Sequence, residues 1–167
     1  MAELRVAVVD DCRTDAELLE GYCLDFCEKK GVRCSCEIYG SGLQFIDAAA
    51  DFDLVFLDVE MPDMDGIKTA GYLRRKDTCA EIVFVTGFAQ FALAGYKVEA
   101  LDYIVKPCDR TSFDITMDGF FRKYVGRRPN FVSLRSHSVS VRIPKESGLF
   151  VESRGHWLLW HTDKGEI

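Results

Sequence analysis

The chain has 167 residues, of which 48% are hydrophobic and 29% are charged, and its formal net charge is −6. This composition is typical of globular proteins and excludes disordered, collagen-like and membrane-spanning classes. Its apolar runs are too short to cross a bilayer. An acid near the N-terminus, where a signal peptide would carry basic residues, favours a cytoplasmic protein.

Short apolar segments alternate with amphipathic segments as far as residue 125. The pattern predicts strands at residues 4–10, 32–39, 53–58, 81–86 and 101–106. It predicts helices at residues 15–30, 42–50, 66–76, 88–96 and 110–125. Such an alternation indicates parallel strands covered on both faces, because right-handed crossovers place the helices there. We therefore expect an α/β fold with a doubly wound sheet.

The seven cysteines indicate reduced thiols, because the count is odd and no export signal is present. Cys23 and Cys27 lie one helical turn apart, and Cys34 and Cys36 alternate along an expected strand. Neither pair has the C-x-x-C spacing of a zinc or redox site. We expect these thiols to fill the core, and we assign no metal to them.

Polar residues stand at the carboxyl ends of four expected strands, where open parallel sheets form their sites. They are Asp10, Asp11, Asp58, Thr86 and Lys106. Each alone has a structural explanation, since an acid or Thr can cap a helix or begin a turn and a Lys can point to water. Together they would meet at one edge of the sheet.

This combination suggests phosphoryl-transfer chemistry. Three carboxylates repel one another unless a cation lies among them, and oxygen ligands suit Mg²⁺, which also binds phosphate oxygens. A hydroxyl and an ammonium opposite the metal could hold a phosphoryl group. The set therefore fits a site in which a carboxylate is the nucleophile.

The motifs "VVDD", "LVFLDVEMPDMDG", "FVTG" and "YIVKP" occur in an order and at distances that resemble the receiver domain of bacterial two-component response regulators. The resemblance covers roughly residues 3–126. It implies a flavodoxin-like receiver at residues 1–126, with five parallel strands in the order 2-1-3-4-5 and a short all-β antiparallel segment after it.

The resemblance also implies roles for the acids. Asp58 would accept a phosphoryl group from the phosphohistidine of a sensor histidine kinase. Mg²⁺ would be held by Asp10, Asp11, Asp58 and the backbone carbonyl of Glu60. Gly66, which closes the loop after Asp58, would allow a close approach or an unusual backbone angle.

Three further residues would bind or respond to the phosphoryl group. By the same resemblance, Thr86 would bond its oxygens, Lys106 would pair with them, and Tyr103 would be the switch aromatic that turns inward. Pro107 resembles the cis proline that places this Lys in receivers. Phosphorylation is expected to promote a homodimer through the elements at 88–96, 101–106 and 110–125, which Thr86 and Tyr103 flank.

A hydrolase with an aspartate nucleophile and Mg²⁺ is the competing enzyme class. Such hydrolases need a second Asp two residues after the nucleophile, where this chain has Glu60, and their acid pair lies downstream of it. We therefore expect a self-phosphorylating switch on Asp58 and not an enzyme of multiple turnover.

The C-terminal segment differs from the rest in charge and pattern. Residues 1–119 carry a net charge of −11, whereas residues 120–167 carry +5, which suggests an anionic partner such as nucleic acid. Its apolar and polar residues alternate in short runs broken by turn residues, as in antiparallel hairpins. "GLFVESRGHWLLWHT" resembles the start of a LytTR-type DNA-binding domain, here at residues 130–167, in which Arg154 and His156 would face promoter DNA.

Two other interpretations of this segment stay open. It can be a basic β appendage, and the chain can be a stand-alone receiver that acts through protein contacts without DNA binding. A complete LytTR domain needs roughly 100 residues, whereas only about 40 follow residue 126, too few to close an independent β core. We therefore expect a truncated regulator with poor specific DNA binding.

Overall fold

The computed structural model describes residues 3–48, 50–76, 79–87, 98–126, 131–136, 139–144, 148–154, 157–162 and 165–166. Its first strands are β1 (Leu4–Val9), β2 (Cys34–Tyr39), β3 (Leu54–Leu57), β4 (Glu81–Thr86) and β5 (Asp102–Val105). Its helices are α1 (Arg13–Lys29), α2 (Gly42–Asp47), α3 (Gly66–Lys76) and α5 (Arg110–Gly126). The helix expected at 88–96 lies outside the described residues.

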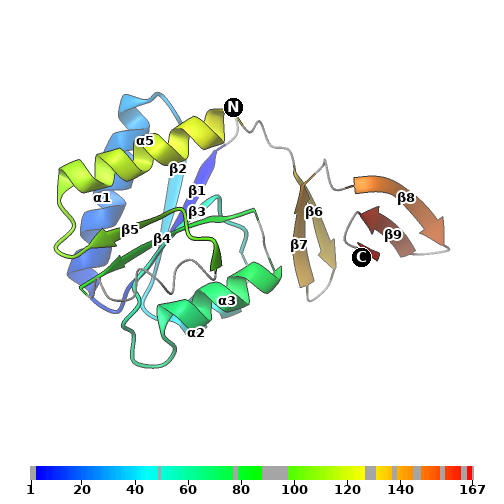
Figure 1. The fold of residues 1–167 in the computed structure, drawn as a ribbon, viewed down its shortest axis with the longest axis horizontal. Coiled ribbons are helices and arrows are strands. Elements are labelled where there is room, and N and C mark those ends of the chain that lie inside the picture. Colours follow the sequence, from blue (N-terminus) through cyan, green and yellow to red (C-terminus); the bar gives the residue numbers. More distant parts are fainter. Residues whose placement is uncertain are drawn as a thin grey trace.

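The five strands form one parallel sheet in the order β2-β1-β3-β4-β5. This confirms the order implied by the receiver resemblance. In Figure 1, α1 and α5 lie on one face of the sheet, and α2 and α3 lie on the other. The arrangement is the doubly wound α/β fold, whose sites form beyond the carboxyl ends of the strands.

Successive side chains of a strand point to opposite faces of the sheet, so one strand contributes to the core on both faces. In β1, Val6 and Val8 pack into the core cluster under α1 and α5, while Ala7 and Val9 join the cluster under α2 and α3. All four are fully buried. Because both faces of the strand are covered, β1 reads as a continuous apolar run rather than as an alternating one.

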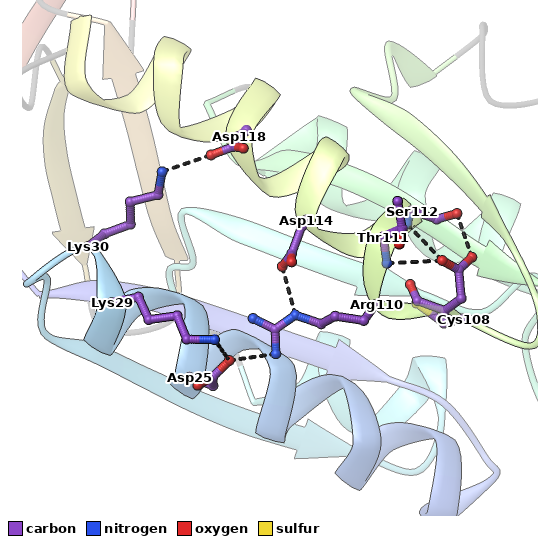
Figure 2. A network of polar contacts seen from close by, with 10 residues as sticks. Asp25, Lys29, Lys30, Cys108, Arg110, Thr111, Ser112, Asp114 and Asp118 are labelled. Atoms are coloured by element: carbon purple, nitrogen blue, oxygen red, sulfur yellow. Dashed lines mark hydrogen bonds and ion pairs between the residues drawn. The ribbon is translucent and has the colours of Figure 1, made fainter.

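Helices α1 and α5 are joined by ion pairs as well as by their shared core (Figure 2). The Arg110 guanidinium contacts Asp114 of its own helix at 2.8 Å and Asp25 of α1 at 2.5 Å, and Lys30 Nζ lies 2.9 Å from Asp118. These partly exposed pairs stabilise the fold little. They join the two helices at two points.

Helix α1 is followed by a glycine and carries two buried cysteines. Gly31 follows the helix with φ of 67°, a left-handed conformation that favours glycine at a helix end. Cys23 and Cys27 are buried in the core, and all seven cysteines are free thiols. None of the helices that the structure describes has the length and apolarity needed to span a membrane.

The C-terminal segment contains antiparallel strands. Strands β6 (Phe131–Ser136) and β7 (Val139–Pro144) form a hairpin, and β7 contacts α3. Strands β8 (Gly148–Arg154), β9 (Trp157–Thr162) and β10 (Gly165–Glu166) form a second antiparallel sheet. Whether residues 130–167 belong to a LytTR-type domain stays a prediction.

Candidate functional site

The sheet register brings the predicted residues to one edge. Val9 pairs with Leu57, so Asp10 and Asp58 follow neighbouring strand ends, and the Asp58 N–H donates to the Val9 carbonyl at 2.9 Å. On the other side of β3, Thr86 ends β4. The Lys106 N–H donates to the Thr86 carbonyl at 2.9 Å, which places Lys106 directly after β5.

The Lys106 ammonium is the centre of the side-chain contacts. Its Nζ lies 2.7 Å from Asp10 Oδ2, 2.8 Å from Asp58 Oδ2 and 3.0 Å from Asp15 Oδ2. Burial alone would lower the pKa of Lys106, but these three carboxylates outweigh burial and raise it. Lys106 is therefore a permanent cation at neutral pH.

Asp15 is the residue that sequence reasoning missed. It is an acid in the first turn of α1. Its position, four residues after Asp11, was the available signal, since one helical turn brings it back toward the site. Its side chain is 43% exposed, so it lies at the rim of the acid group.

Asp10 is a buried carboxylate of the site. It is 2% exposed, and burial raises its pKa, with Lys106 and the Cys12 N–H acting against burial and the Asp58 charge adding to it. Its Oδ1 accepts from the Cys12 N–H at 2.8 Å. Its Oδ2 is buried and makes no hydrogen bond of acceptable geometry within the described residues, although the Lys106 ammonium is close.

The acids fit a divalent metal ion. Asp10, Asp11 and Asp58 place one ligand oxygen each within 4.8 Å of one another. Asp15 adds a fourth carboxylate, and three of the four contact the single Lys106 ammonium, so the site keeps excess negative charge. Clustered carboxylate oxygens are the ligands of hard ions such as Mg²⁺.

A hydrogen bond to its carboxylate and a close backbone approach by Gly66 hold Asp58 in place. Its Oδ1 accepts from the Glu60 N–H at 3.1 Å, which orients the carboxylate. A Cβ at Gly66 would overlap the Asp58 carbonyl, and the Gly66 N–H donates to the Val59 carbonyl at 2.9 Å. The close approach expected of Gly66 is therefore present. The metal contact expected of the Glu60 carbonyl stays a prediction.

Thr86 and Tyr103 lie beside the acids. The Thr86 side chain is fully buried, and its Oγ1 has no hydrogen-bond partner of acceptable geometry within the described residues. Burial and the Asp58 charge raise the pKa of Tyr103, whereas a contact with the Thr86 hydroxyl lowers it, so the two side chains lie close to each other. The Tyr103 ring packs on Phe84, with centroids 6.4 Å apart.

The structure tests two expectations for single residues near the site. Asp11 does not cap α1, because the N-cap is Cys12, which lacks a side-chain cap. The bond between Lys106 and Pro107 is cis, as the resemblance implied. Of the residues expected to face DNA, Arg154 ends β8 and His156 lies outside the described residues.

The response regulator receiver domain is the family whose model matches this chain, over residues 6–117. The sensory transduction protein LytT of Bacillus cereus is 31% identical over 56% of this chain and 38% of the relative. The transcriptional regulatory protein NatR of Bacillus subtilis is 25% identical over 91% of this chain and 65% of the relative. The aligned part of this chain thus spans about a third of the length of the first curated relatives.

Solved structures show the same fold. The response regulatory domain of protein MrkE from Klebsiella pneumoniae superposes with a TM-score of 0.67 at 20% identity, covering 74% of this chain and all of that domain. The response regulator TrrA from Thermotoga maritima, solved in complex with Mg²⁺ and beryllium fluoride, gives a TM-score of 0.57 at 26% identity. The match covers 70% of this chain and 98% of TrrA.

Proposed function

Because the chain belongs to the response regulator receiver family of bacterial two-component systems, we propose that Asp58 accepts a phosphoryl group from a sensor histidine kinase. The observation that carries the proposal is the position of the Asp58 carboxylate. It lies beside Asp10 and Asp11, whose ligand oxygens are within 4.8 Å of its own, and 2.8 Å from the Lys106 ammonium.

We propose that Mg²⁺ is held by Asp10, Asp11, Asp58 and the Glu60 carbonyl. The bound ion would offset the negative charge of the incoming phosphoryl oxygens. The fit rests on the three clustered carboxylates and on the excess negative charge of the site. The solved complex of TrrA with Mg²⁺ and beryllium fluoride supports it by similarity.

The chain's own residues then have separate tasks. An Asp58 oxygen attacks phosphorus as the bond from phosphorus to the histidine nitrogen breaks, and the Glu60 N–H orients the carboxylate. Lys106 turns from Asp58 Oδ2 to a phosphoryl oxygen, so the pocket keeps its cation. The Thr86 hydroxyl, which has no hydrogen-bond partner of acceptable geometry among the described residues, donates to another phosphoryl oxygen.

Movement of Thr86 would pass to Tyr103 and to the surface of β5 and α5. Val105 of β5 and Ile115 of α5 are 47% and 66% exposed, so both elements present an apolar side chain that a second copy of the chain could cover. We propose that phosphorylation promotes a homodimer on this side. The dimer would present promoter-binding segments in pairs, in keeping with the transcriptional role that the name of NatR states for that relative.

Phosphorylation with a small phosphodonor tests the proposal. The protein is incubated with phosphoramidate and Mg²⁺, and the phosphorylated fraction is measured on a phosphate-affinity gel. Wild type and Asp63→Asn, which alters an exposed acid in the same loop, should be modified equally. Asp58→Asn, or chelation of divalent ions, should abolish the modification, and undiminished labelling in either case would overturn the proposal.

A further inference from the structure

Arg74, in the last turn of α3, bonds to the backbone just before two strands of the sheet. Its Nε donates to the Val98 carbonyl at 2.7 Å, and its Nη2 donates to the Glu99 carbonyl at 3.3 Å. Its Nη1 donates to the carbonyl of Ala80, the residue before β4. Val98 and Glu99 lie in the turn that leads into β5. One guanidinium therefore holds the start of both strands whose other ends contribute to the acid pocket.

Glu99 has a backbone conformation that side chains other than glycine rarely adopt. Its φ is 50°, and among the described residues it is the one non-glycine residue with positive φ. Such a conformation costs energy and persists only where the surroundings enforce it. The two carbonyls that Arg74 Nε and Nη2 bind flank the Glu99 Cα. In an extended strand successive carbonyls point in opposite directions, so a single guanidinium would not reach both. The fork of Arg74 thus selects the strained turn at Glu99.

This turn determines how β5 begins. Two residues after Glu99, the Leu101 N–H donates to the Ile82 carbonyl of β4 at 2.7 Å. The pairing of the two strands continues from there and sets Tyr103 opposite Phe84. A change of conformation at Glu99 would therefore displace the first residues of β5, and Tyr103 with them.

Helix α3 connects the turn to the phosphoacceptor. At its start, Gly66 lies so close to the Asp58 carbonyl that a Cβ would overlap it. At its end, Arg74 holds the turn before β5. Because a helix of this length moves as one element, a displacement of the backbone at Asp58 would shift the guanidinium relative to the two carbonyls that it binds.

We propose that Arg74 is a positioning residue, which holds the turn at Glu99 in its strained conformation while Asp58 is unphosphorylated and loosens it on phosphorylation. The first half of the inference concerns the unphosphorylated protein alone, and the second half rests on the proposed function of Asp58. Coupling between two sites is reciprocal for binding. A variant that loosens the turn must therefore also favour binding of a phosphoryl mimic at Asp58, and a variant that stabilises the turn must disfavour it.

Hydrogen exchange of the full unphosphorylated chain tests the hold on the turn, with residues 98–105 followed by mass spectrometry. Arg74→Met removes the fork and should speed their exchange about tenfold or more. Glu99→Gly keeps the guanidinium and allows positive φ at no cost, so it should slow exchange. Arg75→Met is the matched control, because the Arg75 guanidinium lies over the Tyr72 ring, 4.1 Å from its centroid, and should leave exchange unchanged. Wild-type exchange in Arg74→Met, or faster exchange in Glu99→Gly, would overturn the inference.

Binding of beryllium fluoride with Mg²⁺, a reversible mimic of the phosphoryl group, separates positioning from support of the fold. By calorimetry, Arg74→Met should bind the mimic about threefold or more tightly than wild type, and Glu99→Gly about threefold more weakly. A general loss of stability would not move the two variants in opposite directions. Equal affinities, or weaker binding by both, would overturn the coupling. A wild-type chain that neither binds the mimic nor is labelled at Asp58 would overturn the proposed function and the coupling with it, while the exchange rates still decide whether Arg74 holds the turn.

Discussion

Replacement of Lys106 by methionine should destabilise the metal-free protein strongly. The side chain of Lys106 is 18% exposed, and its ammonium lies within 3.0 Å of three carboxylates, of which Asp10 is 1% exposed and Asp58 is 8% exposed. Methionine keeps an unbranched apolar side chain of nearly the same length and removes the ammonium. The change therefore leaves two buried carboxylates without their cation.

The size of the effect follows from the contacts. One pair of unit charges 2.8 Å apart attracts by about 6 kcal/mol at an effective dielectric constant of about 20, and the loss of hydration offsets most of this. Removing one partner of a buried pair costs about 3–5 kcal/mol. We take about 3 kcal/mol for Lys106, which lowers Tm by about 6–12 °C in a chain of this size.

Thermal unfolding in a chelating buffer measures the effect, with two matched variants. Asp15→Asn removes the partner that is 43% exposed and should lower Tm by no more than a few degrees, because exposed pairs contribute about 0–1 kcal/mol. Asp10→Asn in the Lys106→Met background should recover part of the loss, because it removes one of the two uncompensated buried charges. A Lys106→Met protein that melts within about 2 °C of wild type would refute the electrostatic argument.

Three further outcomes follow from the site. The raised pKa of Asp10 means that the folded protein binds the Asp10 proton more tightly than the unfolded chain does, so the ionised carboxylate destabilises the metal-free protein at high pH. Asp10→Asn should therefore raise the free energy of unfolding near pH 8. Urea unfolding should show that this gain shrinks as the pH falls toward about 3.9. Gly66→Ala should cost about 1–3 kcal/mol and slow phosphorylation, because its Cβ would displace the Asp58 backbone, whereas Gly71→Ala in the same helix has open space and should be neutral or stabilising by chemical denaturation. Added Mg²⁺ should raise the Tm of wild type with the logarithm of its concentration, and Asp58→Asn should reduce that rise in differential scanning fluorimetry.

The fold and the strand-end residues were accessible from the sequence for one physical reason. Parallel strands buried on both faces read as short apolar runs, so the residue that ends each run is also the residue at the sheet edge. Asp58 and Thr86 could be located in this way without any contact information. Gly66 was recognisable as well, since a glycine after a tight acidic loop suggests a close backbone approach.

Contacts that depend on packing between elements were not accessible. Asp15 joins the site only because α1 lies so that its first turn faces Lys106. Similarly, Arg74 of α3 donates hydrogen bonds to the carbonyls of Ala80 and Val98, and the second of these holds the segment that leads into β5. No local sequence pattern signals these contacts.

The central claim is that Asp58 is the sole phosphoacceptor. Borohydride reduces an aspartyl phosphate to homoserine, so reduction of the phosphorylated protein marks the acceptor permanently, and peptide mass spectrometry then locates it. The account predicts homoserine at position 58 alone, formed only when Mg²⁺ was present during phosphorylation. Homoserine at Asp10, Asp11 or Asp15, or at position 58 without a divalent ion, would contradict it.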